Sequence, residues 1–172
     1  MGCRGSIGLN VSDEKLKQTP NKTVSKSPAP HAPTISKDDI YLYGLGSWER
    51  SWEKLGAHPD TQSRVRGWRF DVWAPEVKSV RVIGEFNEWD ESANFLERLG
   101  SSDVWEGFIP RAQQGQLYKY VIETEEGELL YKADPYAFKA ECPPGTASVL
   151  WSIEGYRWQD GSWLKQRREH NH

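Results

Sequence analysis

The chain has 172 residues, a formal net charge of -3 and an aromatic content of 12%, including nine Trp. This length suits one domain with a tail and excludes a (β/α)₈ barrel, which needs about 250 residues. No run of about 18 apolar residues could cross a membrane, and the slight acidity disfavours non-specific binding to nucleic acid. Cys3 and Cys142 lie in unlike contexts and predict neither a disulfide framework nor a metal site. We therefore expect a reduced cytoplasmic protein with no cofactor and with no nucleic-acid or membrane partner.

Residues 1–37 differ in composition from the rest of the chain. They hold four prolines, six basic and two acidic side chains, and no aromatic residue. A stretch with so little apolar surface cannot offset the entropy lost when the chain is ordered. The composition therefore predicts a disordered basic leader over 1–37.

Residues 38–62 are predicted to form a connecting segment with one short helix. Trp48, Trp52 and Leu55 follow one another at spacings of four and three residues, which is typical of a helical turn near Ser47–Lys54. The pair His58-Pro59 is expected to end this helix, because proline restricts the backbone of the residue before it.

Alternating apolar residues predict short β-strands over residues 63–156. In the first strand, at 68–74, every second residue is apolar, so one face is expected to be buried. Further strands are predicted at 80–83, 104–109, 117–123, 129–131 and 147–151. Short strands separated by turns favour an all-β, immunoglobulin-like sandwich. Residues 157–172 are expected to form a C-terminal helical segment, with an exposed helix near 162–168.

The sequence offers little catalytic chemistry. It has no Ser-His-Asp motif, no glycine-rich phosphate loop and no His/Cys cluster. His58, the one histidine outside the leader and the C-terminal tail, is expected to have a capping or packing role. The carboxylate pairs Asp90-Glu91 and Glu125-Glu126 lie in predicted turns, where we expect both to be solvated.

The turn at residues 84–90 is the most informative stretch. Asn87 and Asp90 are natural turn formers, and Trp89 follows between two acidic residues. An indole at the tip of such a polar turn is expected to be exposed. The alternative is that Trp89 folds onto the edge of the sheet.

Lys119 and Tyr131 are predicted to share a face with this turn. Lys119 points outward if the tyrosines on either side of it point inward, and Tyr131 follows the next hairpin. The alternatives are a plain solvated lysine and a core or edge tyrosine. An exposed indole can stack on the C–H face of a glucose ring while rim side chains bond its hydroxyls. Such a shallow site predicts weak binding, with a Kd of about 0.1–1 mM.

Seven motifs follow one another along residues 38–168: Tyr41–Gly44, Glu53–His58, Phe70–Pro75, Gly84–Asp90, Tyr118–Tyr120, Ala133–Phe138 and Gly145–Ser148. Together they resemble the N-terminal region of bacterial 1,4-alpha-glucan (glycogen) branching enzymes. The resemblance implies an early-set β-sandwich, namely a carbohydrate-binding module of family 48, with alpha-1,4-glucan as its ligand. It implies a glycan-binding site formed by Trp89, Lys119 and Tyr131, with Asn87, Thr146 and Ser148 nearby.

The family's chemistry lies in a following alpha-amylase-type barrel, where an Asp nucleophile and a Glu acid/base act on the glucan. None of those residues has a match here, so the chain is expected to have no catalytic residues and to be inactive alone. The resemblance implies a partner barrel and a role in glycogen biosynthesis. Two alternatives stay open: a structural support domain that binds no sugar, and a free-standing glycogen-targeting adaptor.

Overall fold

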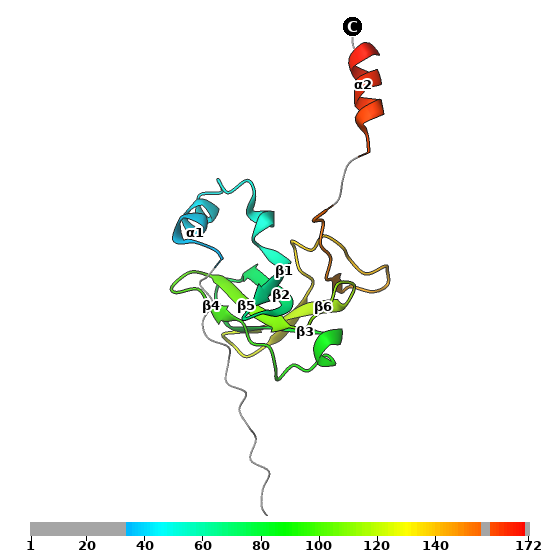
Figure 1. Cartoon of the computed structure of the whole chain (residues 1–172). Helices are drawn as coiled ribbons and strands as arrows, with labels where there is room; N and C mark the ends of the chain where they lie inside the picture. The colour runs from blue at the N-terminus through cyan, green and yellow to red at the C-terminus, as the bar shows by residue number, and fades with distance from the viewer. Residues whose placement is uncertain (1–33, 156–158, 171–172) are drawn as a thin grey trace, which may run out of the picture.

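The computed structural model describes residues 34–155 and 159–170 (Figure 1). Most of the predicted leader, residues 1–33, lies outside the described residues. The described fold starts before residue 38, because Ile35 is only 2% exposed and packs with Leu55 and Val104. Ordered packing thus includes the last residues of the stretch predicted as leader.

A helix that the sequence did not predict opens the described chain. Helix α1 spans Lys37–Gly44, and its N-cap Ser36 exchanges hydrogen bonds with Asp39 in a capping box. None of its residues is fully buried, and only Ile40 and Tyr43 pack against the small cluster of Ile35, Leu55 and Val104, so its apolar pattern in the sequence is weak. The predicted helical turn near 47–54 is reduced to a 3₁₀ turn, η1, at Ser51–Glu53.

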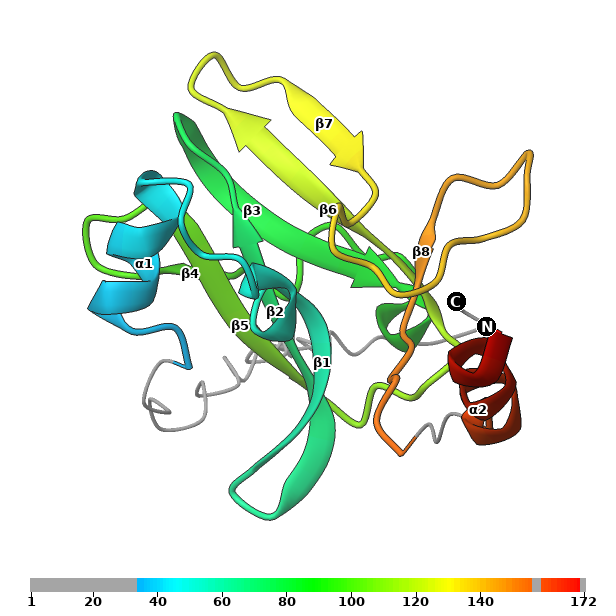
Figure 2. The same ribbon diagram turned by 90° about the horizontal axis from the view of Figure 1, so that it is seen from above.

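Two antiparallel sheets form the body of the protein (Figures 1 and 2). The first has the strand order β1-β2-β5-β4, and the second has the order β3-β6-β7, with β8 also paired to β6. The strands are β1 Gly56–Gln62, β2 Val65–Trp73, β3 Val77–Gly84, β4 Glu97–Arg98, β5 Val104–Pro110, β6 Leu117–Thr124, β7 Leu129–Lys132 and β8 Ser148–Val149. A 3₁₀ turn η2 at Glu85–Asn87 follows β3, and helix α2 spans Gly161–His170. The predicted all-β sandwich is confirmed.

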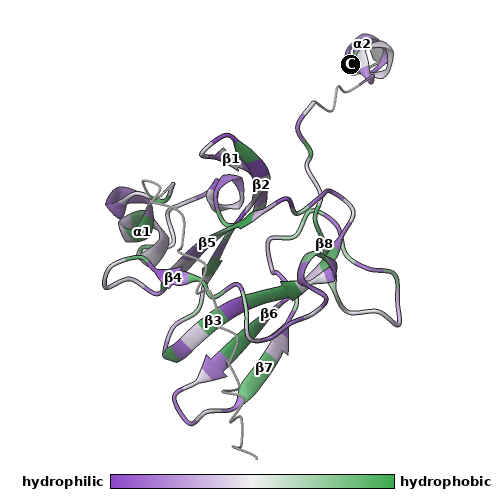
Figure 3. Cartoon of the chain, turned by 60° about the horizontal axis from the view of Figure 1, so that its bottom comes forward, coloured by the Kyte–Doolittle hydropathy of each residue, from purple (hydrophilic) through white to green (hydrophobic). Residues whose placement is uncertain are grey.

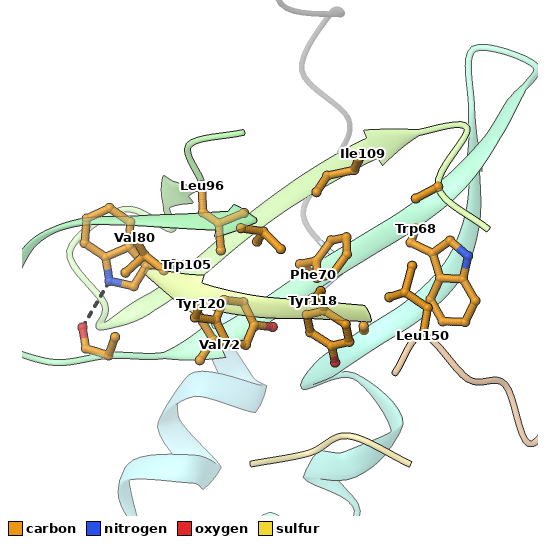
Figure 4. Packing of buried hydrophobic residues seen from close by; sticks show 14 residues of the cluster. Trp68, Phe70, Val72, Val80, Leu96, Trp105, Ile109, Tyr118, Tyr120 and Leu150 are labelled. Carbon is orange, nitrogen blue, oxygen red and sulfur yellow. Dashed lines mark hydrogen bonds between the residues drawn. The ribbon is translucent and has the colours of Figure 1, made fainter. Parts of the chain in front are cut away.

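The main core fills the space between the sheets (Figure 4). Phe70 and Tyr118 from opposite sheets meet edge to face, with ring centroids 5.3 Å apart. The Trp105 indole N–H donates to the Ala74 carbonyl oxygen at 3.0 Å, so this large ring is buried without an unpaired donor. Hydrophobic and hydrophilic residues are mixed along β3 (Figure 3), and Val80 and Val82 on either side of Arg81 face this core.

Both faces of β2 are buried, although the sequence predicted only one. The expected apolar positions, Trp68, Phe70, Val72 and Ala74, do face the core. On the opposite face Arg69 and Asp71 are covered as well, with exposed fractions of 8% and 0%. The segment before β1 supplies two hydrogen-bond partners of Arg69, the Thr34 hydroxyl and the Lys54 carbonyl oxygen.

Strand β1 corrects a second prediction, since His58-Pro59 lies inside it and does not end a helix. Proline has no N–H for a ladder, but β1 is an edge strand and needs bonds on one side only. The His58 ring contacts Leu55 O through Nε2 at 3.0 Å and packs against Phe138, which confirms its packing role. Burial lowers its pKa.

The other predicted strands are found at their expected positions, except that β3 begins three residues earlier than predicted and the last strand is only two residues long. The two-residue strand β4 was not predicted. Across the described ranges 34–155 and 159–170, neither helix has the length and apolar character needed to cross a membrane.

Candidate functional site

The candidate site lies on the outer face of the β3-β6-β7 sheet. The two tyrosines that flank Lys119 on β6 are buried in the core, so Lys119 and Val121 point to the other side. Val121 pairs with Tyr131 on β7, and Lys119 pairs with Ile83 on β3. Lys119 and Tyr131 are therefore diagonal neighbours on one face, about 7–8 Å apart between Cα atoms.

A hydrogen-bonded turn holds Trp89 at the end of β3. The Asn87 side chain accepts from the Gly84 N–H at 2.8 Å and donates to two carbonyl oxygens at 3.2 Å. The Trp89 N–H donates to Gly84 O at 2.9 Å, so the turn closes on its own start. Glu88 and Trp89 both adopt left-handed backbone conformations, with φ of 55° and 61°. The Trp89 side chain is 38% exposed, as predicted.

Close packing under the turn explains why it begins with glycine. A Cβ atom on Gly84 would lie 2.4 Å from the Leu117 carbonyl oxygen, far inside contact distance. The next residues point Phe86 into the core, where its ring lies 6.0 Å from that of Phe70. The packing of Gly84 against Leu117 and of Phe86 against Phe70 thus fixes the backbone that carries Trp89 on the sandwich.

Lys119 is held in place by a partner from a distant loop. Its Nζ donates to Thr146 Oγ1 at 2.7 Å, which joins β6 to the segment that precedes β8. The contact is exposed, so both groups can also bond to the hydroxyls of a ligand. Two predicted site residues, Lys119 and Thr146, are therefore in direct contact.

Tyr131 is 48% exposed, and its hydroxyl bonds to Glu91, which lies two residues after Trp89. Its hydroxyl donates to Glu91 Oε1 at 2.6 Å, and this hydrogen bond raises the pKa of Tyr131. Arg81 donates to the Glu91 carbonyl oxygen at 3.0 Å and to Glu123 Oε2 at 2.8 Å, and it stacks over Phe95. Glu91 lies in a turn, as predicted, but it is half-buried and its carboxylate accepts the Tyr131 hydrogen bond. Its partners come from other strands and could not be seen in its local sequence.

Residues 54–137 match the family described as Carbohydrate-binding module 48 (Isoamylase N-terminal domain). The match covers both sheets, apart from β8, and the exposed turn. This segment is a family 48 carbohydrate-binding module.

The module and its flanks are related to the N-terminal part of bacterial 1,4-alpha-glucan branching enzymes. The chain is 50% identical over 120 residues to such an enzyme from Halothermothrix orenii and 42% identical over 156 residues to one from Roseobacter denitrificans. These alignments cover 70% and 90% of this chain but only 19% and 21% of the relatives. The chain therefore spans about a fifth of the length of the curated relatives it matches.

Solved structures of larger proteins give weaker likenesses to the module. A pullulanase from Anoxybacillus sp. LM18-11 in complex with maltotetraose has 23% identity and a TM-score of 0.46, covering 57% of this chain and 14% of the other. An apo pullulanase from Paenibacillus barengoltzii has 21% identity and a TM-score of 0.46, covering 64% and 18%.

Two predicted site residues, Ser148 and Asn87, have side chains that bond to the module itself. Ser148 is 1% exposed, and its Oγ accepts a hydrogen bond from the Asp134 N–H at 2.8 Å. It pairs with the buried Tyr118 across β6 and β8, and paired residues face the same side, so Ser148 points inward. The prediction that Ser148 lies near the glycan face is wrong. The Asn87 side chain makes its hydrogen bonds to the backbone of the turn, so it positions the backbone that carries Trp89.

Sequence reasoning missed the buried carboxyl groups of the module. Asp134 accepts from the Tyr118 hydroxyl at 2.6 Å and from the Tyr136 N–H at 2.8 Å, and Asp71 pairs with Arg69. Burial raises the pKa of Asp134 and that of Asp71. Both are enclosed by packing and reach no ligand, so they stabilise the fold. Within the described part of the chain, no three His, Cys, Asp or Glu side chains are grouped to hold a metal.

Proposed function

We propose that the module binds alpha-1,4-glucan, including glycogen, through the face that carries Trp89, Lys119, Thr146 and Tyr131. The observation that carries this proposal is the exposed indole of Trp89 on a hydrogen-bonded turn, in a loop that bonds to Tyr131 through Glu91. A flat indole suits the C–H face of a glucose ring, and the ammonium and hydroxyl groups suit its rim hydroxyls. The role of this face is a proposal from geometry and from the family to which the module belongs.

The relatives' names suggest where such binding would act. Each is a 1,4-alpha-glucan branching enzyme, and this chain spans only about a fifth of it. We infer that the chain serves as the N-terminal glucan-binding part of such an enzyme in cytoplasmic glycogen biosynthesis. It would bring substrate to a linked catalytic domain and would form no branch by itself.

A titration with maltoheptaose, followed by NMR on the ¹⁵N-labelled chain, tests the proposal. We expect a Kd of about 0.1–1 mM, because the surface is shallow and leaves much of the sugar in water. The indole N–H of Trp89 and the amide of Lys119 should shift. Trp89→Ala should weaken binding about tenfold or more, since it removes the stacking surface.

Trp163→Ala is the matched control, because Trp163 is also an exposed indole but lies on α2. This variant should bind like the parent chain. If the NMR signals of the folded parent chain do not shift at maltoheptaose concentrations of several times the expected Kd, the result would favour a structural support domain that binds no sugar. Equal losses in the two variants would show that binding does not depend on the Trp89 face.

A further inference from the structure

A second surface, built from other residues, carries three arginines that form no ion pair within the described chain. The β1–β2 hairpin extends beyond the rest of the sandwich (Figure 2), and a groove of about 950 Å³ lies along it. Its lining includes Arg64 and Arg66 from the hairpin and Arg111, Gln113 and Gln114 from the loop after β5. None of these residues belongs to the glycan face described above.

The strand register brings two of the arginines together. Gly67 on β2 pairs with Pro110 on β5 at the end of the ladder, and Arg66 and Arg111 are the next residues along the two chains. The Arg111 N–H donates to the Arg66 carbonyl oxygen at 2.8 Å. Arg64 lies two residues before Arg66, at the end of the same hairpin. Like charges on neighbouring segments repel each other unless another group compensates them.

These arginines differ from the others in the sandwich and the segment before it. Elsewhere in residues 34–155 every arginine pairs with a carboxylate: Arg50 with Glu53, Arg69 with Asp71, Arg81 with Glu123 and Arg98 with Asp103. Among the described residues, no ion pair or side-chain hydrogen bond occupies the guanidinium groups in the groove.

Two carboxylates also line the groove and lower its net charge, but neither forms an ion pair with its arginines in the described chain. Asp60 accepts hydrogen bonds from the N–H of Thr61 at 2.7 Å and from Gln62 Nε2 at 3.2 Å, and Glu154 pairs with no arginine of the described chain. A cluster of unpaired guanidinium groups in a chain of net charge -3 is a local feature and not a general attraction to anions.

We propose that this groove binds the phosphate group of a phosphorylated sugar. The planar guanidinium fork matches two phosphate oxygens at once, which is the geometry that makes arginine preferred for this anion. The side-chain amides of Gln113 and Gln114 can donate to and accept from the sugar hydroxyls beside it. The sugar phosphate is either a free small molecule or a phosphorylated glucose within a glucan chain, since both present the same group.

Titration of the whole chain with glucose 6-phosphate tests the assignment, with calorimetry and the NMR signals of the arginine Nε–H groups as readouts. We expect a Kd of about 0.1–1 mM at low salt, no binding of glucose, and at least about fivefold weaker binding of inorganic phosphate. Maltoheptaose that carries one 6-phosphate distinguishes the two sources. Tighter binding than glucose 6-phosphate indicates a phosphorylated glucan, and equal or weaker binding indicates a free sugar phosphate.

Charge-matched variants locate the site. Arg66→Gln and Arg111→Gln should each weaken binding of glucose 6-phosphate about five- to tenfold, because each removes a charge-assisted contact. Arg66→Lys keeps the positive charge but not the planar guanidinium group, so it should weaken the binding of glucose 6-phosphate less than Arg66→Gln does. Arg168→Gln, on the exposed surface of α2, makes the same charge change elsewhere and should stay within about twofold.

Three results would overturn the proposal. These are equal affinity for inorganic phosphate, tighter binding of a glutamate-rich peptide, and equal losses in Arg66→Gln and Arg168→Gln. The substituted side chains are exposed, so circular dichroism should show a folded chain in each case. Trp89→Ala should leave glucose 6-phosphate binding unchanged, so the glucan proposal and the phosphate proposal can fail separately.

Discussion

Arg69 holds the segment before β1 onto the sandwich, and its replacement by methionine should be strongly destabilising. Its guanidinium donates to Asp71 Oδ2 at 2.5 Å, to Thr34 Oγ1 at 3.2 Å and to the Lys54 carbonyl oxygen at 3.1 Å. Asp71 is fully buried, and its Oδ1 already has no hydrogen-bond partner. Arg69→Met keeps most of the side-chain length but leaves this carboxylate without its cation.

The expected cost at neutral pH is about 3–5 kcal/mol, the range for removing one partner of a buried ion pair. A domain of this size has a free energy of unfolding of about 5–15 kcal/mol, so the loss is a large share of it. The midpoint of thermal unfolding should fall by roughly 10 °C or more. Arg98→Met is the control, because Arg98 and Asp103 pair on the surface, where a pair contributes at most about 1 kcal/mol.

The effect should depend on pH in a defined direction. Burial raises the pKa of Asp71 above that of the unfolded chain. Its protonated form is therefore favoured in the fold, and the stability it contributes is present at low pH and lost as the pH rises through the folded pKa. Without Arg69 this pKa rises further. Urea unfolding at about pH 7.5 and about pH 4.5 should show a smaller loss from Arg69→Met at the lower pH.

The Asp71→Asn change made in the Arg69→Met background completes the test. It removes the unpaired charge and should restore part of the stability at neutral pH, because a neutral amide costs less to bury than a carboxylate. A loss below about 1 kcal/mol in Arg69→Met, or a loss that is the same at both pH values, would refute the reasoning from burial and charge.

Two further substitutions test the glycan face. Gly84→Ala should cost about 1–3 kcal/mol in urea unfolding, because its Cβ meets the Leu117 carbonyl oxygen, and it should shift the NMR signal of the Trp89 indole without added sugar. Lys119→Met should weaken maltoheptaose binding about three- to tenfold by loss of a donor, yet change stability by less than about 0.5 kcal/mol. Unchanged affinity in Lys119→Met would remove Lys119 from the proposed site.

Local patterns predicted the features that depend on neighbours in sequence. Alternation identified the inward face of β2, and the turn formers at 84–90 predicted an exposed Trp89, which the structure confirms. The features that the sequence did not predict depend on contacts between residues far apart in the chain. The inward direction of Ser148 follows from its register with Tyr118, and the position of Glu91 follows from its bond to Tyr131, 40 residues away. Neither contact has a signature in the residues that make it.

The polar pairs on the glycan face set a limit on how tightly it can bind. Lys119 already bonds to Thr146, and Tyr131 already bonds to Glu91, so a sugar hydroxyl that enters either pair exchanges one hydrogen bond for another. The net gain must then come mainly from the apolar surface that the indole of Trp89 and the glucose ring cover together. The weak affinity that we propose for one glucan segment would become useful on a polymer, where neighbouring segments raise the effective concentration of the next contact.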